Sequence, residues 1–240
     1  MFISIILLGL ISGLIKNILI FTSIIFIHEL GHFLVAKAFG WNVDKIYFYP
    51  YGGFTKFNDD LNKPKIQELI IMISGPLFQI LYFCFIINHL TISEIEMFKN
   101  YHYSILLFNL LPIYPLDGGK FLNIILNYFM SFRNSFKLTI YFSYVFICFV
   151  ILFFLNKNVS ISLSLLLVII LVFCKLTEEL KKERFYFNKF LLERYLNDYK
   201  FPKIKVINNI VNMSRDYKHV IFKEGKTKTE KEELSRYFRR

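Results

Sequence analysis

Long blocks of apolar residues, separated by short polar breaks, run from residue 2 to residue 174. A helix needs about 20 mostly apolar residues to cross the hydrocarbon core of a bilayer, and most of these blocks approach or reach that length. The pattern therefore predicts an all-α polytopic membrane protein with about six transmembrane helices. The expected spans are residues 2–14, 18–39, 66–87, 101–130 with an interruption at 112–120, 138–155 and 160–174.

Residues 40–65 interrupt this apolar pattern. Two aromatic runs, Ile46–Tyr49 and Phe54–Phe57, flank a turn at Pro50–Gly53. Such runs around a Pro/Gly turn are typical of a β-hairpin, and the many aromatic rings favour the membrane interface. The segment therefore predicts a membrane-associated β-hairpin. An ordinary interfacial loop anchored by tyrosines is the alternative.

After residue 174 the chain becomes polar and charged, which predicts two domains. Residues 1–174 would form the membrane domain, and residues 175–240 a linker helix with a small cytoplasmic C-terminal α/β appendage. The expected elements of this tail are a helix at 175–199 ended by Pro202, strands at 203–207 and 218–222, and a helix at 230–238.

Composition and charge agree with this division. With 55% hydrophobic and only 20% charged residues, the composition excludes a soluble domain of this size. From Lys175 onward there are 18 Lys and Arg against 10 Asp and Glu, a net of +8 within the total of +11. Cytoplasmic segments are rich in Lys and Arg, so both termini are predicted to be cytoplasmic. A basic tail favours anionic lipid of the bilayer or an acidic partner. No nucleic-acid motif accompanies the charge, so no direct nucleic-acid contact is expected.

The second apolar block contains the sequence His28-Glu29-Leu30-Gly31-His32. At helical pitch His28 and His32 lie one turn apart on one face, so both imidazoles can reach one cation. Glu29 lies beside that cation, where it can polarise a water molecule, which is the arrangement of a zinc hydrolase. Ionisable groups at membrane depth are costly and rarely occur without a use. The alternative, that the histidines only pair with helix neighbours, is less economical.

A catalytic zinc site usually has three protein ligands. Within the spans and their breaks, Asp117 is the only other acidic residue well away from the loop ends. It lies where the fourth span is broken, and Gly118 and Gly119 let the chain turn there. Asp117 is therefore the candidate third ligand. It can also cap the helix that begins near Phe121, or form a salt bridge with Lys120.

Further polar and turn residues are candidates for contact with a substrate. The hairpin edge can hold an extended peptide by strand addition, and the broken span offers a polar lining. The candidate substrate-binding residues are Asn109, Gly52, Gly53, Pro112 and Pro115. The remaining histidines, His89, His102 and His219, lie at loop or span ends and are not expected to have a catalytic role.

Three motifs occur in a fixed order with the Gly-Gly hairpin between the first two: His28–His32, Ser74-Gly75-Pro76 and Asn109–Gly119. Together they resemble the site-2 protease family of intramembrane zinc metalloproteases, over about residues 1–175. Pro50–Gly53 and the presence of a tail after the sixth span resemble the sporulation branch of that family.

The resemblance implies one zinc ion on His28, His32 and Asp117, with Glu29 as the catalytic glutamate. It also implies cleavage of a membrane-tethered pro-sequence, which in the sporulation branch belongs to a sigma-factor precursor. That branch implies the mother-cell membrane around the forespore of a bacterium, and membrane proteins that inhibit the enzyme. It carries a C-terminal cystathionine-β-synthase-type (CBS) domain thought to bind ATP. Residues 203–240 are too few for a full domain of this kind, which puts ATP binding in doubt.

We therefore expect hydrolysis of a peptide bond inside the bilayer, with Glu29 taking a proton from water and passing it to the leaving amine. One alternative is a protease of the same family that acts on another membrane-tethered substrate. A different class, a membrane metal transporter or metal-binding protein, has no need of a glutamate beside the first histidine. It would also favour rows of acidic residues along several spans. A catalytically inactive scaffold is disfavoured by the intact Glu29.

Overall fold

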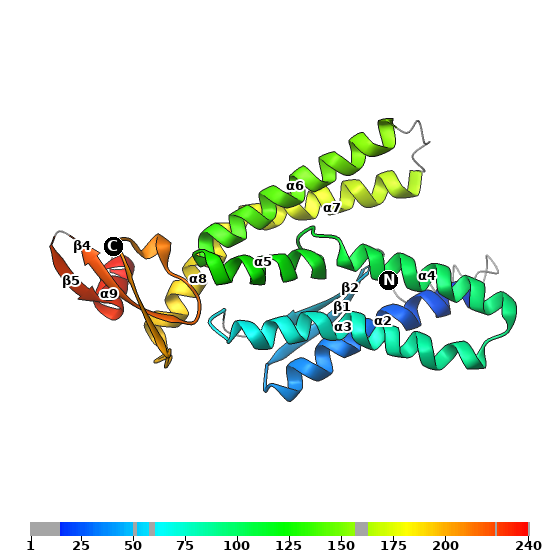
Figure 1. Cartoon of the computed structure of the whole chain (residues 1–240), viewed down its shortest axis with the longest axis horizontal. Coiled ribbons are helices and arrows are strands. Elements are labelled where there is room, and N and C mark those ends of the chain that lie inside the picture. The colour runs from blue at the N-terminus through cyan, green and yellow to red at the C-terminus, as the bar shows by residue number, and fades with distance from the viewer. Residues whose placement is uncertain (1–14, 50–51, 58–60, 157–162, 224, 240) are drawn as a thin grey trace. The chain divides into compact units, whose positions relative to one another are not determined.

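The computed structural model describes residues 15–49, 52–57, 61–156, 163–223 and 225–239 of the chain (Figure 1). Its internal contacts divide the chain into two units. The first comprises residues up to 59 and residues 70–110, and the second comprises residues 60–69 and 111–240. The span expected at residues 2–14 lies outside the described residues, as do Pro50 and Tyr51 of the expected hairpin turn.

Helix α2 (Ile15–Ala38) of the first unit confirms the helix expected at residues 18–39. Gly40 ends this helix with a φ of +72°, a left-handed conformation that glycine adopts without steric cost. The amide of Trp41 then donates to the carbonyl oxygen of Ala36 at 2.9 Å, which closes the helix end.

The predicted β-hairpin is confirmed. Strands β1 (Val43–Tyr49) and β2 (Gly52–Phe57) pair antiparallel, with Tyr49 opposite Gly52. The register shifts near the start of β1, and both strands contact α2. The hairpin therefore lies along the helix that carries the two candidate histidines.

Helix α3 (Lys65–Ile86) confirms the helix expected at residues 66–87 and contains Pro76 in its interior. Gly31 of α2 lies against it, because a Cβ atom at Gly31 would come within 2.7 Å of the carbonyl oxygen of Ser74. A glycine at this position allows the two backbones to approach closely, as small residues do between membrane helices.

The spans expected at residues 66–87 and 101–130 imply a polar loop at residues 88–100, and this expectation was wrong. A short 3-10 helix, η1 (Ile87–His89), is followed directly by α4 (Ile92–Leu110). The amide and hydroxyl of Thr91 donate to the carboxylate of Glu94 at 2.7 and 2.6 Å, so a Thr-x-x-Glu sequence begins the helix. The buried core of this unit contains Ile24, Ile25, Phe98 and Ile105.

Four helices form most of the second unit. They are α5 (Asp117–Phe129), α6 (Phe132–Asn156), α7 (Leu163–Lys181) and α8 (Glu183–Leu196), and each of α5, α7 and α8 contacts α6. The broken span thus resumes at Asp117 and not at Phe121. The single tail helix expected at 175–199 was also wrong, because its first turns continue α7 and a second helix begins after Lys182.

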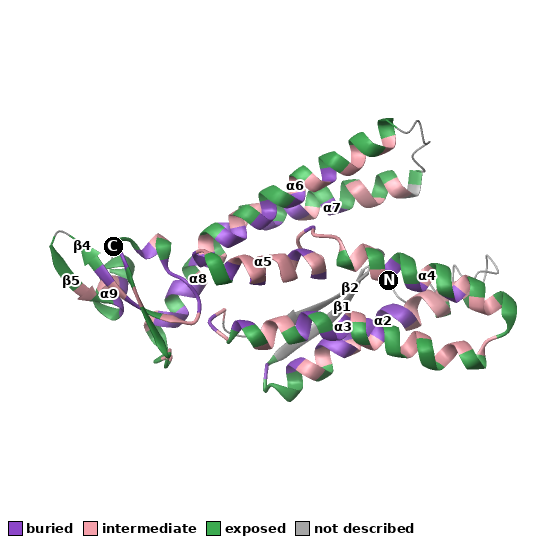
Figure 2. Cartoon of the chain, viewed as in Figure 1, coloured by how far each residue is buried: buried purple, intermediate pink, exposed green. Residues whose placement is uncertain are grey.

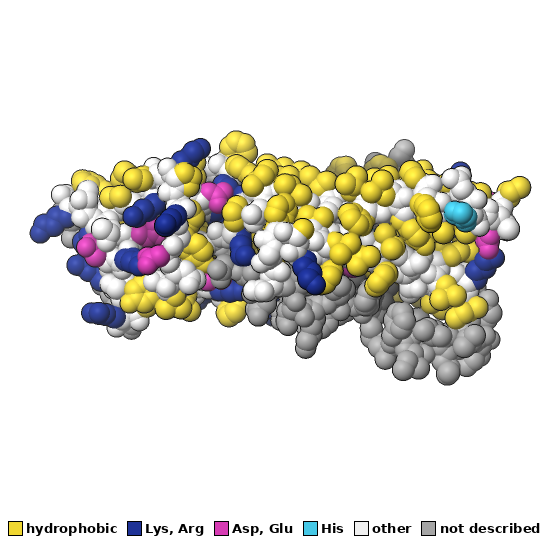
Figure 3. Space-filling view, turned by 90° about the horizontal axis from the view of Figure 1, so that it is seen from below, with side chains coloured by type: hydrophobic (Ala, Val, Ile, Leu, Met, Phe, Trp, Pro, Cys, Tyr) yellow, Lys and Arg dark blue, Asp and Glu magenta, His cyan; other side chains and the backbone are white. Residues whose placement is uncertain are grey.

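Three helices in the described part of the chain are long and apolar enough to cross a membrane: α2, α3 with η1, and α6. Helix α7 carries four charged residues near its C-terminal end, and α5 has only 13 residues. Large apolar side chains are exposed along α3, α6 and α7. Figure 2 shows many exposed positions on these helices, and hydrophobic side chains cover much of the face seen in Figure 3. These features support a membrane protein, and the count of six spans stays a prediction.

The tail forms a small three-stranded sheet with one helix, which confirms the expected strands and terminal helix. Strand β3 (Lys203–Ile207) pairs parallel with β4 (Tyr217–Lys223), and β5 (Lys226–Thr229) pairs antiparallel with β4. A 3-10 helix, η2 (Ile210–Asn212), connects β3 to β4, and α9 (Glu230–Phe238) follows β5. The sheet, α8 and α9 share a buried core that includes Phe190, Leu191, Met213, Ile221 and Leu234.

The segment that leads into α3, residues 61–68, is bound to the tail within the second unit. The amide of Leu61 and the side chain of Asn62 donate to the Glu193 carboxylate at 2.7 and 3.0 Å. Arg194 donates back to the amide oxygen of Asn62 at 2.6 Å. Arg215 of the tail pairs with Glu68 and donates to the carbonyl oxygen of Lys63 at 2.7 Å.

Candidate metal centre

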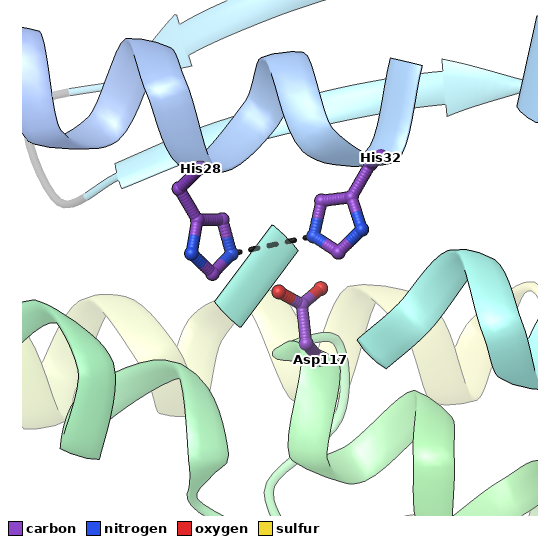
Figure 4. A group of neighbouring side chains, drawn as sticks. All are labelled: His28, His32 and Asp117. Carbon is purple, nitrogen blue, oxygen red and sulfur yellow. Dashed lines mark hydrogen bonds between the residues drawn. The ribbon is translucent and has the colours of Figure 1, made fainter. Parts of the chain in front are cut away.

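His28 and His32 lie on one face of α2 and are almost wholly buried, at 1% and 3% exposure. Their Nε2 atoms are 3.3 Å apart, and the two rings are nearly perpendicular (Figure 4). Glu29, the next residue along the helix, is 5% exposed. The helix therefore places the candidate ligands and the candidate proton-transfer group together in a buried site, as the spacing predicts.

The outer nitrogen of each ring has a hydrogen-bond partner on α3. The Nδ1 atom of His32 lies 2.7 Å from the carbonyl oxygen of Ile71, and the Nδ1 atom of His28 lies 2.9 Å from the side-chain oxygen of Gln79. An oxygen of either kind can only accept, so both Nδ1 atoms donate. Each neutral ring then has its lone pair on Nε2, and the two lone pairs face one another. Two such nitrogens are suited to bind one cation placed between them.

Gly75 of α3 leaves the space that the His32 ring fills. A Cβ atom at Gly75 would come within 2.2 Å of Nε2 and 2.4 Å of Cε1 of His32. Any side chain at this position would therefore overlap the imidazole. The role of Gly75 within the Ser-Gly-Pro motif is thus steric, and the spacing of the histidines alone does not reveal it.

Asp117 belongs to the second unit, where it is the first residue of α5 and 9% exposed. The N-cap position is Leu116, whose side chain makes no capping hydrogen bond, so the alternative of Asp117 as the helix cap is wrong. The alternative pairing with Lys120 is present at 3.3 Å. The break before α5 packs tightly, because a Cβ atom at Gly119 would come within 2.4 Å of the backbone of Ile113.

One ligand atom from each of His28, His32 and Asp117 lies within 4.8 Å of the other two (Figure 4). Two imidazoles and one carboxylate form a donor set found in catalytic zinc sites, which leave a further position open. The residues present therefore fit a zinc ion. The ion pair with Lys120 does not conflict with this, since a carboxylate has two oxygens and several lone pairs.

The candidate substrate-binding residues lie on three separate elements. Gly52 and Gly53 begin β2, opposite Tyr49 and Phe48. Asn109 is half-buried near the end of α4, and Pro112 and Pro115 are half-buried in the break before α5. Their contact with a substrate stays a prediction.

Among the other histidines, His89 is exposed, and His219 is buried within the tail. His102 is 2% exposed and contacts Gln79, which is itself wholly buried. Sequence reasoning did not single out Gln79. The available signal was an amide side chain in the middle of an apolar span.

Comparison with known proteins places these observations in a family context. Residues 16–104 match the family model for peptidase family M50. The stage IV sporulation protein FB of Bacillus subtilis is 31% identical over 196 residues, which cover 78% of this chain and 67% of that protein. A zinc metalloprotease of Methanocaldococcus jannaschii is 36% identical over 129 residues, which cover 50% of this chain and 37% of the relative. Among solved structures, a site-2 protease from Methanocaldococcus jannaschii matches with a TM-score of 0.57 and 25% identity, over 74% of this chain and 85% of the other.

Proposed function

The chain belongs to peptidase family M50, the site-2 protease-type intramembrane metalloproteases, and we propose from this that it cuts a membrane-tethered protein precursor inside the bilayer. We assign one zinc ion per chain to His28, His32 and Asp117. Glu29 is the proposed catalytic residue. The membrane-protease domain is proposed to comprise residues 1–174, and both termini are proposed to be cytoplasmic.

The observation that carries the proposal is the pair of Nε2 atoms 3.3 Å apart in a buried site. Both outer nitrogens are held by acceptors on α3, so the arrangement presents two ligand lone pairs to one point. A buried histidine pair with a purely structural role would have no need for both lone pairs to converge. The neighbouring Glu29 adds the group that a hydrolase needs.

His28, His32 and Asp117 would hold the zinc ion, which would supply Lewis acidity and lower the pKa of a water molecule to about 7. Glu29 takes the proton from the attacking water and delivers it to the amine of the leaving peptide. Burial of this carboxylate keeps bulk water from competing for the proton. Asn109 is proposed to hydrogen-bond the substrate backbone or the developing oxyanion.

The substrate must be extended, because a helix hides its carbonyl groups in internal hydrogen bonds. Among the described residues this sheet has only the strands β1 and β2, and a peptide can add to an outer edge of it. Gly52 and Gly53 lie in β2 without side chains that would obstruct such an approach. Pro112 and Pro115 keep the chain before α5 out of helical conformation, so that it can line the site.

The proposed substrate is the precursor of a sporulation sigma factor, in the mother-cell membrane around the forespore. The similarity to a stage IV sporulation protein supports this choice. Membrane inhibitor proteins are proposed partners on the same ground. Another membrane-tethered substrate of the same enzyme class is the second possibility, and the experiment below separates the two by the precursors supplied.

The test is co-expression of the chain with candidate membrane-tethered precursors, scored for a cleavage product that disappears when zinc is removed. Glu29→Gln should keep zinc and abolish the product, because the change removes the proton acceptor and leaves all three proposed ligands. Glu96→Gln, the same change at an exposed position of α4, is the matched control. Near-normal turnover by Glu29→Gln would refute Glu29 as the catalytic residue. A wild-type chain that binds zinc but cuts none of the precursors would refute the protease proposal and favour a metal transporter.

A further inference from the structure

Gln79 lies wholly buried on α3, between a candidate zinc ligand and a histidine of α4. Its side-chain oxygen is 2.9 Å from Nδ1 of His28. Its side-chain nitrogen donates to the main-chain carbonyl oxygen of His102 at 2.9 Å and lies 3.3 Å from Nδ1 of the same residue. One amide therefore joins α2 to α4 through α3, entirely within the first unit.

The orientation of this amide follows from the chemistry of its partners. A main-chain carbonyl can only accept, so the NH₂ group of Gln79 must face His102 and the oxygen must face His28. The reverse orientation would place two oxygens against each other at hydrogen-bonding distance, without a proton between them. The oxygen that faces His28 then requires a proton on Nδ1 of His28, which leaves Nε2 as the ligand atom.

The acceptor on α4 is itself held rigidly. The His102 carbonyl belongs to the helix backbone, and the His102 ring is 2% exposed and stacks on Phe83 at 4.5 Å with an angle of 18° between the planes. The Nδ1 atom of His102 can accept the second N–H of the Gln79 amide. Both hydrogens of the amide are then used, and the group has a single low-energy orientation.

We propose that Gln79 is a positioning residue of the metal centre. Its side-chain oxygen selects the form of His28 that carries a proton on Nδ1, and the main-chain carbonyl oxygen of His102 on α4 fixes the orientation of the Gln79 amide. Buried partners of this kind orient the ligand and raise its basicity. His32 needs no such residue, because a main-chain oxygen of α3 plays the same part. The inference rests on the proposed zinc site.

The experiment measures zinc affinity by chelator competition, and the visible absorption of the Co²⁺-substituted protein, in detergent. Wild-type protein is measured first, since a chain that binds no zinc would refute the proposed function itself. Gln79→Met has a similar volume but only a weak thioether acceptor for His28, and should bind zinc about 10- to 100-fold more weakly with an altered Co²⁺ spectrum. Gln79→Glu keeps a side-chain oxygen that can accept from Nδ1 of His28, and should restore most of the affinity.

Two controls separate positioning from a general loss of stability. Gln67→Met makes the same change at a half-buried position of α3 and should leave zinc affinity unchanged. His102→Phe keeps the main-chain acceptor and the stacking on Phe83, and should weaken zinc binding far less than Gln79→Met. If Gln79→Met does not fold, Gln79→Asn, whose amide is one methylene too short to reach His28, takes its place. Wild-type zinc affinity and spectrum in the folded variant, or failure of Gln79→Glu to restore them, would overturn the inference and leave the zinc site standing.

Discussion

The replacement Gly75→Ala is the sharpest steric test of the metal centre. The added Cβ atom would lie 2.2 Å from Nε2 and 2.4 Å from Cε1 of His32, where ordinary contacts begin near 3.4 Å. The ring must therefore retreat by at least about 1.2 Å, because α3 presents backbone at this point and a buried interior has little spare room. Metal-to-ligand distances tolerate only about 0.2 Å, so the displaced Nε2 atom cannot remain a zinc ligand.

The retreat of the ring has a second cost. His32 Nδ1 is held by the carbonyl oxygen of Ile71 at 2.7 Å, and a rotation that frees Nε2 from the new methyl group breaks this bond. A buried hydrogen bond contributes about 0.5–1.5 kcal/mol to the free energy of unfolding. We therefore expect a modest loss of stability together with a loss of zinc of tenfold or more, about 1.4 kcal/mol or more in binding free energy.

Zinc content after dialysis against graded chelator, and melting temperature in detergent, measure the two effects. Gly40→Ala is the control, since its Cβ atom would meet nothing within 4 Å while its φ of +72° still strains the backbone. That variant should lose stability and keep its zinc. Wild-type zinc affinity in folded Gly75→Ala would refute the steric argument and, with it, the assignment of His32 Nε2 as a ligand.

Three further changes probe other parts of the molecule. Asp117→Ala should lower zinc affinity if the carboxylate is a ligand, whereas stoichiometric zinc in dialysed protein would exclude it. Burial lowers the pKa of His219 below its usual value of about 6.5, so the unfolded tail binds a proton that the folded tail does not, and stability should fall as the pH drops below about 6.5. Between about pH 7.5 and pH 5.5, the melting temperature should therefore change less with pH in His219→Gln than in the wild-type protein, and an equal change would contradict this. Arg215→Ala removes a buried donor from the Glu68 carboxylate and should lower the free energy of unfolding by about 1–3 kcal/mol; the exposed Arg184→Ala is its control, and equal effects would contradict the reasoning.

The features that the sequence predicted well depend on local spacing. His28 and His32 are four residues apart, and the hairpin and the tail strands follow from turn residues and alternation within short segments. Asp117 was found by elimination, as an acid inside a broken span. Each of these signals lies within about a dozen residues.

Features that depend on contacts between distant segments were missed. Gln79 is an ordinary polar residue in a span until α2 and α4 lie against α3. Gly75 can be understood only beside the His32 ring, 43 positions earlier. The start of α4 was also missed, although its signal is local. Thr91 and Glu94 form a helix-start motif, which the charged residues at 94–99 obscured.

The hydrogen bonds of residues 61–68 have a topological consequence. That segment touches the tail, and the start of α6 does so as well, through the amide of Phe132 and the carbonyl oxygen of Met213 at 3.0 Å. Because they are in contact, three parts of the chain lie on one side of any bilayer: residues 61–68, residue 132 and the tail. Between two successive parts the chain must cross the bilayer an even number of times.

An even number of crossings means that each helix that crosses the bilayer needs a second crossing to return the chain. If α6 crosses the membrane, α7 must bring the chain back, although the charges at its end disqualify it by composition. If α3 crosses, the stretch from α4 to α5 must be its return, and the break that carries Asp117 lies on that passage. An insertion that adds one crossing between two of these parts would therefore break the hydrogen bonds that join the tail to residues 61–68 and to Phe132.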